Sequence, residues 1–156
     1  MQRGTDLHTI FALAVASYAG RCAPPIVSQE YQGYYESMQW WIARWKPEPV
    51  FIERPSISAI KGLAFAGTPD LLGWTSGNGK RLLALIDLKT GQKAPWHRVQ
   101  VQAYQRLLDY QVANALRLLY VHADGSEPDY VPVKLDPRDF AAFHSALNLL
   151  IYRETI

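Results

Sequence analysis

The sequence predicts a mixed α/β fold, with a central sheet of about five strands flanked by helices on both faces. Helical and extended patterns follow one another in the order helix, helix, three strands, helix, two strands, helix. The run from Leu82 to Leu88 is apolar on both alternating sets of positions apart from Asp87, which is typical of a strand buried on both faces. Between two apolar runs lies Asn78-Gly79, the dipeptide most favourable to a two-residue hairpin turn.

Four segments have helical patterns. The first is expected over residues 5–19, with Thr5 as its cap, and the second over residues 29–45, ending before Pro47. The third is expected over residues 95–113, with Pro95 as its first residue, and the fourth opens with Asp136 and Pro137. The second helix carries a stripe at intervals of three and four that we interpret as core: Tyr31, Tyr34, Tyr35, Met38, Trp41, Ile42 and Trp45.

Five segments are expected as strands, over residues 50–54, 63–74, 82–89, 116–122 and 130–135. Pro69 falls inside the second of them. Because proline has no backbone N–H to donate, it must lie at a strand start or a bulge.

Length and composition favour one domain, residues 1–156, since 156 residues with 49% apolar content can build one real core. A net charge of +2 decides nothing about partners. The single cysteine, Cys22, excludes an internal disulfide, a four-cysteine zinc site and an all-cysteine iron–sulfur cluster from this chain. Residues 10–19 are apolar but too few to span a membrane, so we expect a cytoplasmic protein.

The hairpin turn sets two acidic residues opposite each other. If Asn78 and Gly79 are the loop residues, counting outward pairs Asp70 with Asp87. Facing carboxylates are destabilising without a cation between them, and a divalent metal is the simplest such cation. The strand period of two sends Lys89 to the same face as Asp87.

These residues suit phosphodiester hydrolysis. Asp70, Asp87 and the backbone carbonyl of Leu88 could hold Mg²⁺ through oxygen ligands. Lys89 could orient the attacking water or stabilise the negative charge that builds on the phosphate. An Asp-x-Lys tripeptide by itself usually marks a solvated strand end. Together with the opposing Asp70 and the apolar strand that leads into it, the tripeptide is a far more specific signal of a metal site than it is alone.

Polar residues in the third helix could line the same site. Gln100 and Tyr104 are one turn apart and share a face, with His97 on nearly the same stripe. The simpler alternative is an amphipathic helix with a core tyrosine and an exposed glutamine. Lys93, His97 and Arg98 are candidate phosphate contacts or ordinary surface charges.

Four motifs occur in the order found in the PD-(D/E)XK nuclease superfamily, and the chain resembles its RecB-like branch, which includes phage recombination exonucleases. The motifs are Arg3-Gly4-Thr5-Asp6-Leu7-His8, Gly67-Thr68-Pro69-Asp70, Asp87-Leu88-Lys89 and the run from Gln100 to Tyr104. The resemblance implies a restriction-endonuclease-like sheet. It also implies that His8 is a further metal ligand, that Asp70 and Asp87 bind the metal, that Lys89 is catalytic, and that Gln100 and Tyr104 complete the site and contact DNA.

The chain departs from the family pattern in two respects. It has Asp87 where many relatives have Glu, which shortens that ligand. A segment often precedes the histidine-bearing helix in relatives, whereas here the motif starts almost at Met1, as in a short form or a fragment that lacks an N-terminal segment. Glu53 is a weaker candidate near the cleft.

The expected function is a Mg²⁺-dependent deoxyribonuclease in which Mn²⁺ substitutes. We expect an exonuclease that acts on DNA ends in phage-type recombination or repair, with a single-strand annealing or recombination protein as partner and a homo-oligomer as its assembly. Two alternatives stay open. One is a structure-specific or restriction-like endonuclease. The other is a non-catalytic DNA-binding or assembly module of the same fold, suggested by Trp40, Trp41, Trp45 and Trp96, although tryptophans at helical spacing are more often core.

Overall fold

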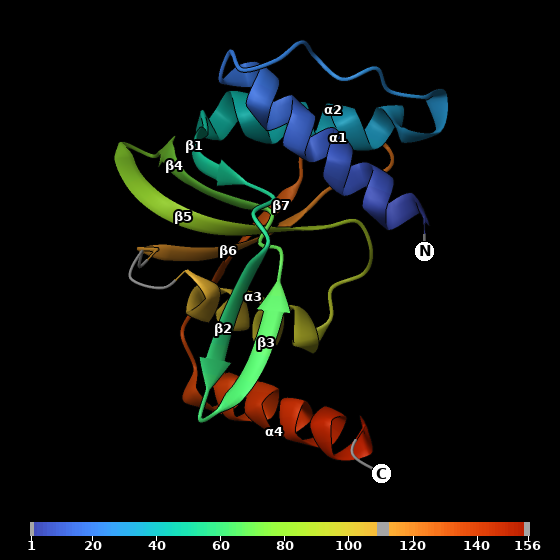
Figure 1. Cartoon of the computed structure of the whole chain (residues 1–156). Coiled ribbons are helices and arrows are strands. Elements are labelled where there is room, and N and C mark those ends of the chain that lie inside the picture. Colours follow the sequence, from blue (N-terminus) through green and yellow to red (C-terminus); the bar gives the residue numbers. More distant parts are fainter. Residues whose placement is uncertain (1, 109–112, 155–156) are drawn as a thin grey trace.

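A five-stranded mixed sheet with the strand order β1-β4-β5-β6-β7 lies at the centre of the protein (Figure 1). In the computed structural model, which describes residues 2–108 and 113–154, its strands are β1 (Glu48–Ile52), β4 (Leu71–Gly77), β5 (Lys80–Lys89), β6 (Ala115–Tyr120) and β7 (Asp129–Val133). Strands β5 and β6 run parallel, and the other neighbouring pairs are antiparallel. The expected mixed sheet of about five strands is confirmed.

Helices cover both faces of this sheet. Helices α1 (Gln2–Tyr18) and α2 (Gln32–Trp45) lie on one face, and a 3-10 turn, Gln29–Tyr31, precedes α2 (Figure 1). Helix α3 (Pro95–Leu107) lies on the other face, with α4 (Pro137–Glu154) packed outside it (Figure 1). None of the helices in the described part of the chain is long and apolar enough to cross a membrane.

Each face of the sheet has its own apolar core. Phe11, Met38 and Trp41 pack with Ile86 on the α1–α2 side. On the α3 side, Val101 packs with Leu85 and Leu118 of the sheet. Neighbouring residues of β5 thus enter opposite cores, as the apolar run predicted. The aromatic stripe of α2 is confirmed as core, since its members are buried or packed against the first cluster.

Two predicted helix ends were wrong. Helix α1 starts at Gln2, so Thr5 lies inside it and accepts a hydrogen bond from Thr9 Oγ1 rather than capping it. Nothing in residues 2–4 breaks a helix beyond the modest cost of Gly4. Helix α3 ends at Leu107 and Ala113 is not helical; residues 109–112 lie outside the described residues. The chain must leave α3 early because β6 begins at Ala115, paired with Ala84 of β5.

The strand predicted over residues 63–74 is two strands in different sheets. Strand β3 (Leu63–Gly67) pairs with β2 (Ser56–Ile60), a strand that the sequence patterns did not predict, in a separate hairpin. Lys61 and Gly62 form its turn, both with positive φ. Pro69, which cannot donate to a ladder, lies in the break between β3 and β4. This hairpin leaves the main sheet between Glu53 and Asp70, so both of its ends lie at the candidate site.

Candidate metal centre

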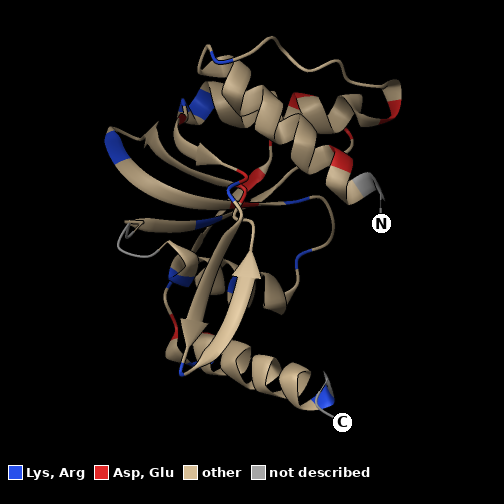
Figure 2. Ribbon diagram, in the orientation of Figure 1, with Lys and Arg blue, Asp and Glu red and all other residues tan. Residues whose placement is uncertain are grey.

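The predicted register of the β4–β5 hairpin is confirmed. Gly77 pairs with Lys80, Asn78 and Gly79 between them have positive φ, and the ladder continues to the pair Leu71 and Ile86. Asp70 lies one residue beyond the last pair of this ladder, so its predicted pairing with Asp87 is not part of the sheet, but its charge is close enough to raise the pKa of Asp87. Figure 2 shows acidic and basic residues gathered here, where the β2–β3 hairpin joins the main sheet.

Asp70 connects three parts of the fold. Its Oδ1 lies 2.6 Å from Nδ1 of His8 on α1, and its Oδ2 accepts a hydrogen bond of 2.7 Å from the backbone N–H of Leu88 on β5. Its backbone carbonyl accepts a 2.8 Å bond from the N–H of Glu53. With only 5% of its surface exposed, Asp70 is fixed in place on all sides.

His8, Glu53 and Asp70 form a group suited to a metal ion. Among the described residues, they are the one set of three potential ligands whose donor atoms all lie within 4.8 Å of one another. Glu53 directly follows β1 and has a φ of 44°, a conformation that costs a non-glycine residue free energy. The structure thus places Glu53, a weaker candidate in the sequence, beside two of the predicted ligands.

The pKa shifts of this group reflect its crowded charges. Burial lowers the pKa of His8, but the hydrogen bond to Asp70 and the charges of Asp70 and Asp87 outweigh burial and raise it overall. The pKa of Glu53 is raised, first by burial and then by the charge of Asp70. A cation bound between these carboxylates would relieve the repulsion that raises the pKa of Glu53.

Asp87 lies outside this group of three and is held by Lys89. Its Oδ2 is 2.7 Å from Lys89 Nζ and, apart from this ion pair, has no hydrogen-bond partner among the described residues. Burial raises the pKa of Asp87 to about 7, against the opposing charge of Lys89 and with a smaller contribution from Asp70. Its role as a metal ligand stays a prediction, as does that of the Leu88 carbonyl.

A chain of side chains leads from Asp87 into α3. Lys89 Nζ donates a 2.7 Å hydrogen bond to Oε1 of Gln100, and Nε2 of Gln100 donates a 2.8 Å bond to the hydroxyl of Tyr104. The predicted shared face of Gln100 and Tyr104 is therefore confirmed, and that face points at Lys89. Gly67 makes room for the Tyr104 ring, because a Cβ at position 67 would lie 2.8 Å from Cε1 of Tyr104.

The sequence patterns did not predict the contacts that hold α3 in position. Nε2 of Gln102 donates to Oδ2 of Asp139 on α4 at 2.6 Å, and its Oε1 accepts from the N–H of Asp136 at 2.8 Å. Asp136-Pro137 signals the start of a helix, but no spacing pattern links it to a residue more than 30 positions away.

The three predicted phosphate contacts all have protein partners. Lys93 Nζ lies 3.0 Å from Oδ2 of Asp129, Nδ1 of His97 lies 2.9 Å from the hydroxyl of Tyr120, and Arg98 donates a 2.8 Å bond to Asp139. Lys93 and Arg98 remain more than half exposed. DNA binding by all three residues stays a prediction.

The four tryptophans considered as stacking candidates divide into two pairs. Trp41 is buried and Trp45 packs against the same core, whereas Trp40 and Trp96 are exposed. Trp96 is the second residue of α3 and makes an edge contact with the ring of His97. The exposed indole of Trp96 offers a surface on which a base could stack.

The donor set of the group of three fits a hard or borderline divalent ion. Two carboxylates suit Mg²⁺ and Mn²⁺, and the imidazole nitrogen of His8 favours a transition ion such as Mn²⁺ over Mg²⁺. The buried, incompletely bonded oxygen of Asp87 is a further acceptor near the group. The residues present therefore fit the predicted metal.

No model of a known protein family matches the chain, and no curated protein does. Among solved structures, the chain is similar to the crystal structure of SSO0001, with 13% identical residues and a TM-score of 0.41. The alignment covers 96% of this chain and 88% of that one.

Proposed function

We infer that the protein is a metal-dependent deoxyribonuclease of the PD-(D/E)XK type, in the RecB-like branch. One observation carries the proposal. Asp70, Asp87 and Lys89, placed together by the hairpin register, lie beside His8 on one side and beside the Gln100–Tyr104 pair on the other. Residues from all four resembling motifs thus converge on one place in the fold.

The residues of the chain have separate roles in the proposed reaction. When bound by His8, Glu53, Asp70 and Asp87, Mg²⁺ or Mn²⁺ would supply Lewis-acid activation of water and neutralise phosphate charge. Water adds to phosphorus as the bond to the leaving oxygen breaks; the attacking water gives a proton to bulk water, and the leaving oxygen takes one up from bulk water. Lys89 carries the N–H donors that stabilise the extra negative charge on the phosphate.

The surroundings of Lys89 support this role. Its Nζ forms an ion pair with Asp87 on one side, and Oε1 of Gln100 on the other fixes the direction of one donor. Since a lysine has three N–H donors, at least one is left to meet a phosphate oxygen. The side chain is largely buried, which strengthens its interaction with charge.

We favour an exonuclease that acts on DNA ends, in recombination or repair of the phage type. A single-strand annealing or recombination protein as partner, a homo-oligomer and a cytoplasmic location belong to the same proposal.

The test uses end-labelled linear DNA and closed circular DNA with wild type and Lys89→Ala, in Mg²⁺, Mn²⁺ or chelator. An exonuclease degrades the linear DNA alone, in either metal, and Lys89→Ala loses this activity. Cutting of the circle would identify an endonuclease instead. A protein that binds both DNAs but cuts neither would be the non-catalytic module, for which the exposed ring of Trp96 is the supporting observation.

A further inference from the structure

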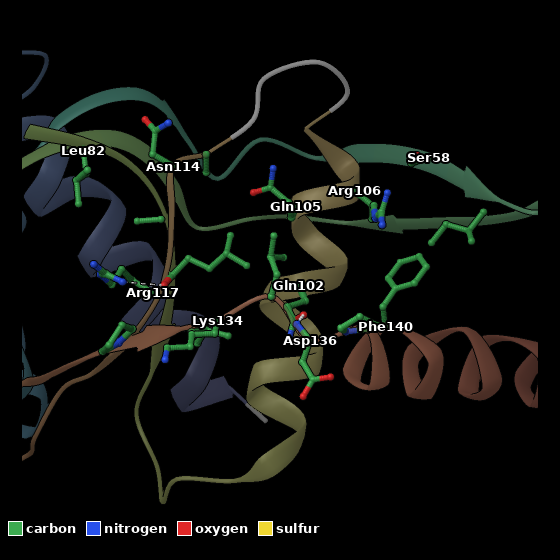
Figure 3. A pocket seen from close by; sticks show the side chains of 18 of the residues that line it. Ser58, Leu82, Gln102, Gln105, Arg106, Asn114, Arg117, Lys134, Asp136 and Phe140 are labelled. Carbon is green, nitrogen blue, oxygen red and sulfur yellow. Dashed lines mark hydrogen bonds between the residues drawn. The ribbon is translucent and has the colours of Figure 1, made fainter.

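Helix α4 is apolar on its outer face as well as on its inner face. The inner face packs against α3 and β3. Phe140 lies next to Arg106 of α3, whose guanidinium is 4.4 Å from the ring centroid (Figure 3). The ring of Phe143 meets that of Phe65 in β3 edge-on. Residues 140–152 include no Asp, Glu, Lys or Arg, so the outer face lacks the charges that a solvated helix face usually carries.

Exposed apolar side chains follow the outer face of α4 along its length. We call them the α4 stripe: Ala141, Ala142, Ala146, Leu149, Leu150 and Tyr152. Leu149 is 69% exposed, Leu150 53% and Tyr152 68%. Ala142, Ala146 and Leu149 recur at intervals of four and three, which is the spacing of a helix that packs lengthwise against another helix. The α4 stripe therefore has the pattern of a helix–helix contact.

The α4 stripe has a half with small side chains and a half with large ones. Its members within residues 141–146 are alanines, and those within residues 149–152 are two leucines and a tyrosine. Two parallel copies of α4 would set alanine against alanine, which leaves a gap. Antiparallel packing about a two-fold axis sets the large half of each helix against the small half of the other. It also opposes the two helix dipoles and keeps the two copies of Arg153 at opposite ends of the pair. The stripe is thus complementary to itself.

The area of the α4 stripe suits a weak dimer. Burial of a leucine side chain removes about 60–120 Å² of apolar surface from water, and burial of a tyrosine about 150–250 Å². At their exposed fractions, Leu149, Leu150 and Tyr152 therefore offer about 200–300 Å² per copy. A standard interface buries about 800 Å² per partner, of which about 450 Å² is apolar. With its three alanines the stripe approaches this apolar area, so we expect an interface at the low end of the standard size.

We propose that the protein forms a two-fold symmetric dimer in which α4 packs antiparallel against α4 of a second copy. Ala146 then faces Leu149 of the partner subunit. The proposal rests on the homo-oligomer of the proposed function, to which it adds the symmetry, the interface and the register. Because α4 lies outside α3, this dimer leaves the metal centre uncovered (Figure 1).

The experiment measures the mass of the protein in solution by sedimentation equilibrium, without DNA, from about 1 to about 100 µM, where a weak interface associates. Wild type should pass from monomer to dimer as its concentration rises. Ala146→Glu and Leu149→Lys each place an unpaired charge in the interface and should raise the dissociation constant at least about tenfold. Ile26→Lys changes an exposed apolar residue between α1 and α2; it is the matched control and should dimerise as wild type does.

A mixture of the two stripe variants tests the register. The acid introduced by Ala146→Glu would face the base introduced by Leu149→Lys, and the symmetry-related contact would keep its native alanine and leucine. An equimolar mixture should therefore form a heterodimer at concentrations where each variant alone is a monomer.

A wild type that stays monomeric would overturn the proposal, as would a dimer that neither stripe variant weakens, or an equal loss in Ile26→Lys. A mixture that stays monomeric would overturn the antiparallel register. A monomer that floats with phosphatidylcholine vesicles would assign the α4 stripe to a membrane surface instead. Because the mass is measured without DNA, a failure of the nuclease proposal would appear only as absent cleavage and would leave this result unaffected.

Discussion

Gln100→Ala tests whether the contact between Lys89 and α3 serves catalysis. The substitution removes the 2.7 Å hydrogen bond that Lys89 donates and the 2.8 Å bond to Tyr104. A hydrogen bond to a charged group is worth about 1.5–3 kcal/mol, and about 1.4 kcal/mol corresponds to a tenfold change in rate. We therefore expect single-turnover cleavage to slow by about 10- to 150-fold, because Lys89 would no longer be held against the phosphate.

The assay follows cleavage of end-labelled linear DNA with enzyme in excess and saturating Mn²⁺. Tyr104→Phe is the matched control, since it keeps the ring and removes only the outer hydroxyl; it should slow cleavage by less than Gln100→Ala. Lys89→Ala, which we expect to be inactive, gives the cleavage rate that corresponds to complete loss of activity. A wild-type rate for Gln100→Ala, with Lys89→Ala inactive, would refute the positioning role, and so would a Tyr104→Phe rate as low as that of Gln100→Ala.

Three further predictions concern metal binding, packing and pH. Glu53→Gln should weaken Mn²⁺ binding measured by calorimetry by about tenfold or more, while Glu48→Gln, on the surface, should not; equal affinities would exclude Glu53 as a ligand. Gly67→Ala should lower the free energy of unfolding in urea by about 1–3 kcal/mol, because its Cβ would press on Tyr104, and should cost much less in a Tyr104→Ala background. The metal-free protein should melt at lower temperature as the pH rises from about 4 to about 7, because the folded state keeps the Asp87 proton up to about 7 whereas the unfolded carboxyl loses it near 3.8. Saturating Mn²⁺ or Asp87→Asn should flatten that dependence, and a melting temperature that is constant or rises over this range would contradict the assignment.

The parts of the site that depend on local periodicity could be predicted from the sequence. Asn78-Gly79 and strand alternation were enough to predict the register as far as Leu71 and Ile86, the residues next to Asp70 and Asp87, because a two-residue turn fixes every later pair of the ladder. Helical spacing was enough to put Gln100 and Tyr104 on one face.

The parts that depend on long-range packing could not be predicted in this way. His8 and Asp70 are 62 residues apart, and their contact depends on how α1 lies over the sheet; it was expected only from the family resemblance. The position of Glu53 depends on a positive φ that no sequence pattern signals. The separate β2–β3 hairpin was missed because its turn is Lys61-Gly62 rather than a dipeptide with Asn or Asp in first place.

The most direct test of the account is calorimetric titration of the metal-free protein with Mn²⁺ and with Mg²⁺, because metal binding can be measured without knowing the natural DNA substrate. Wild type should bind both ions, Mn²⁺ more tightly, and Asp70→Asn/Asp87→Asn should bind neither while remaining folded by circular dichroism. A folded wild type that binds neither ion, or a double variant that binds both as wild type does, would contradict the metal centre on which the proposed function rests.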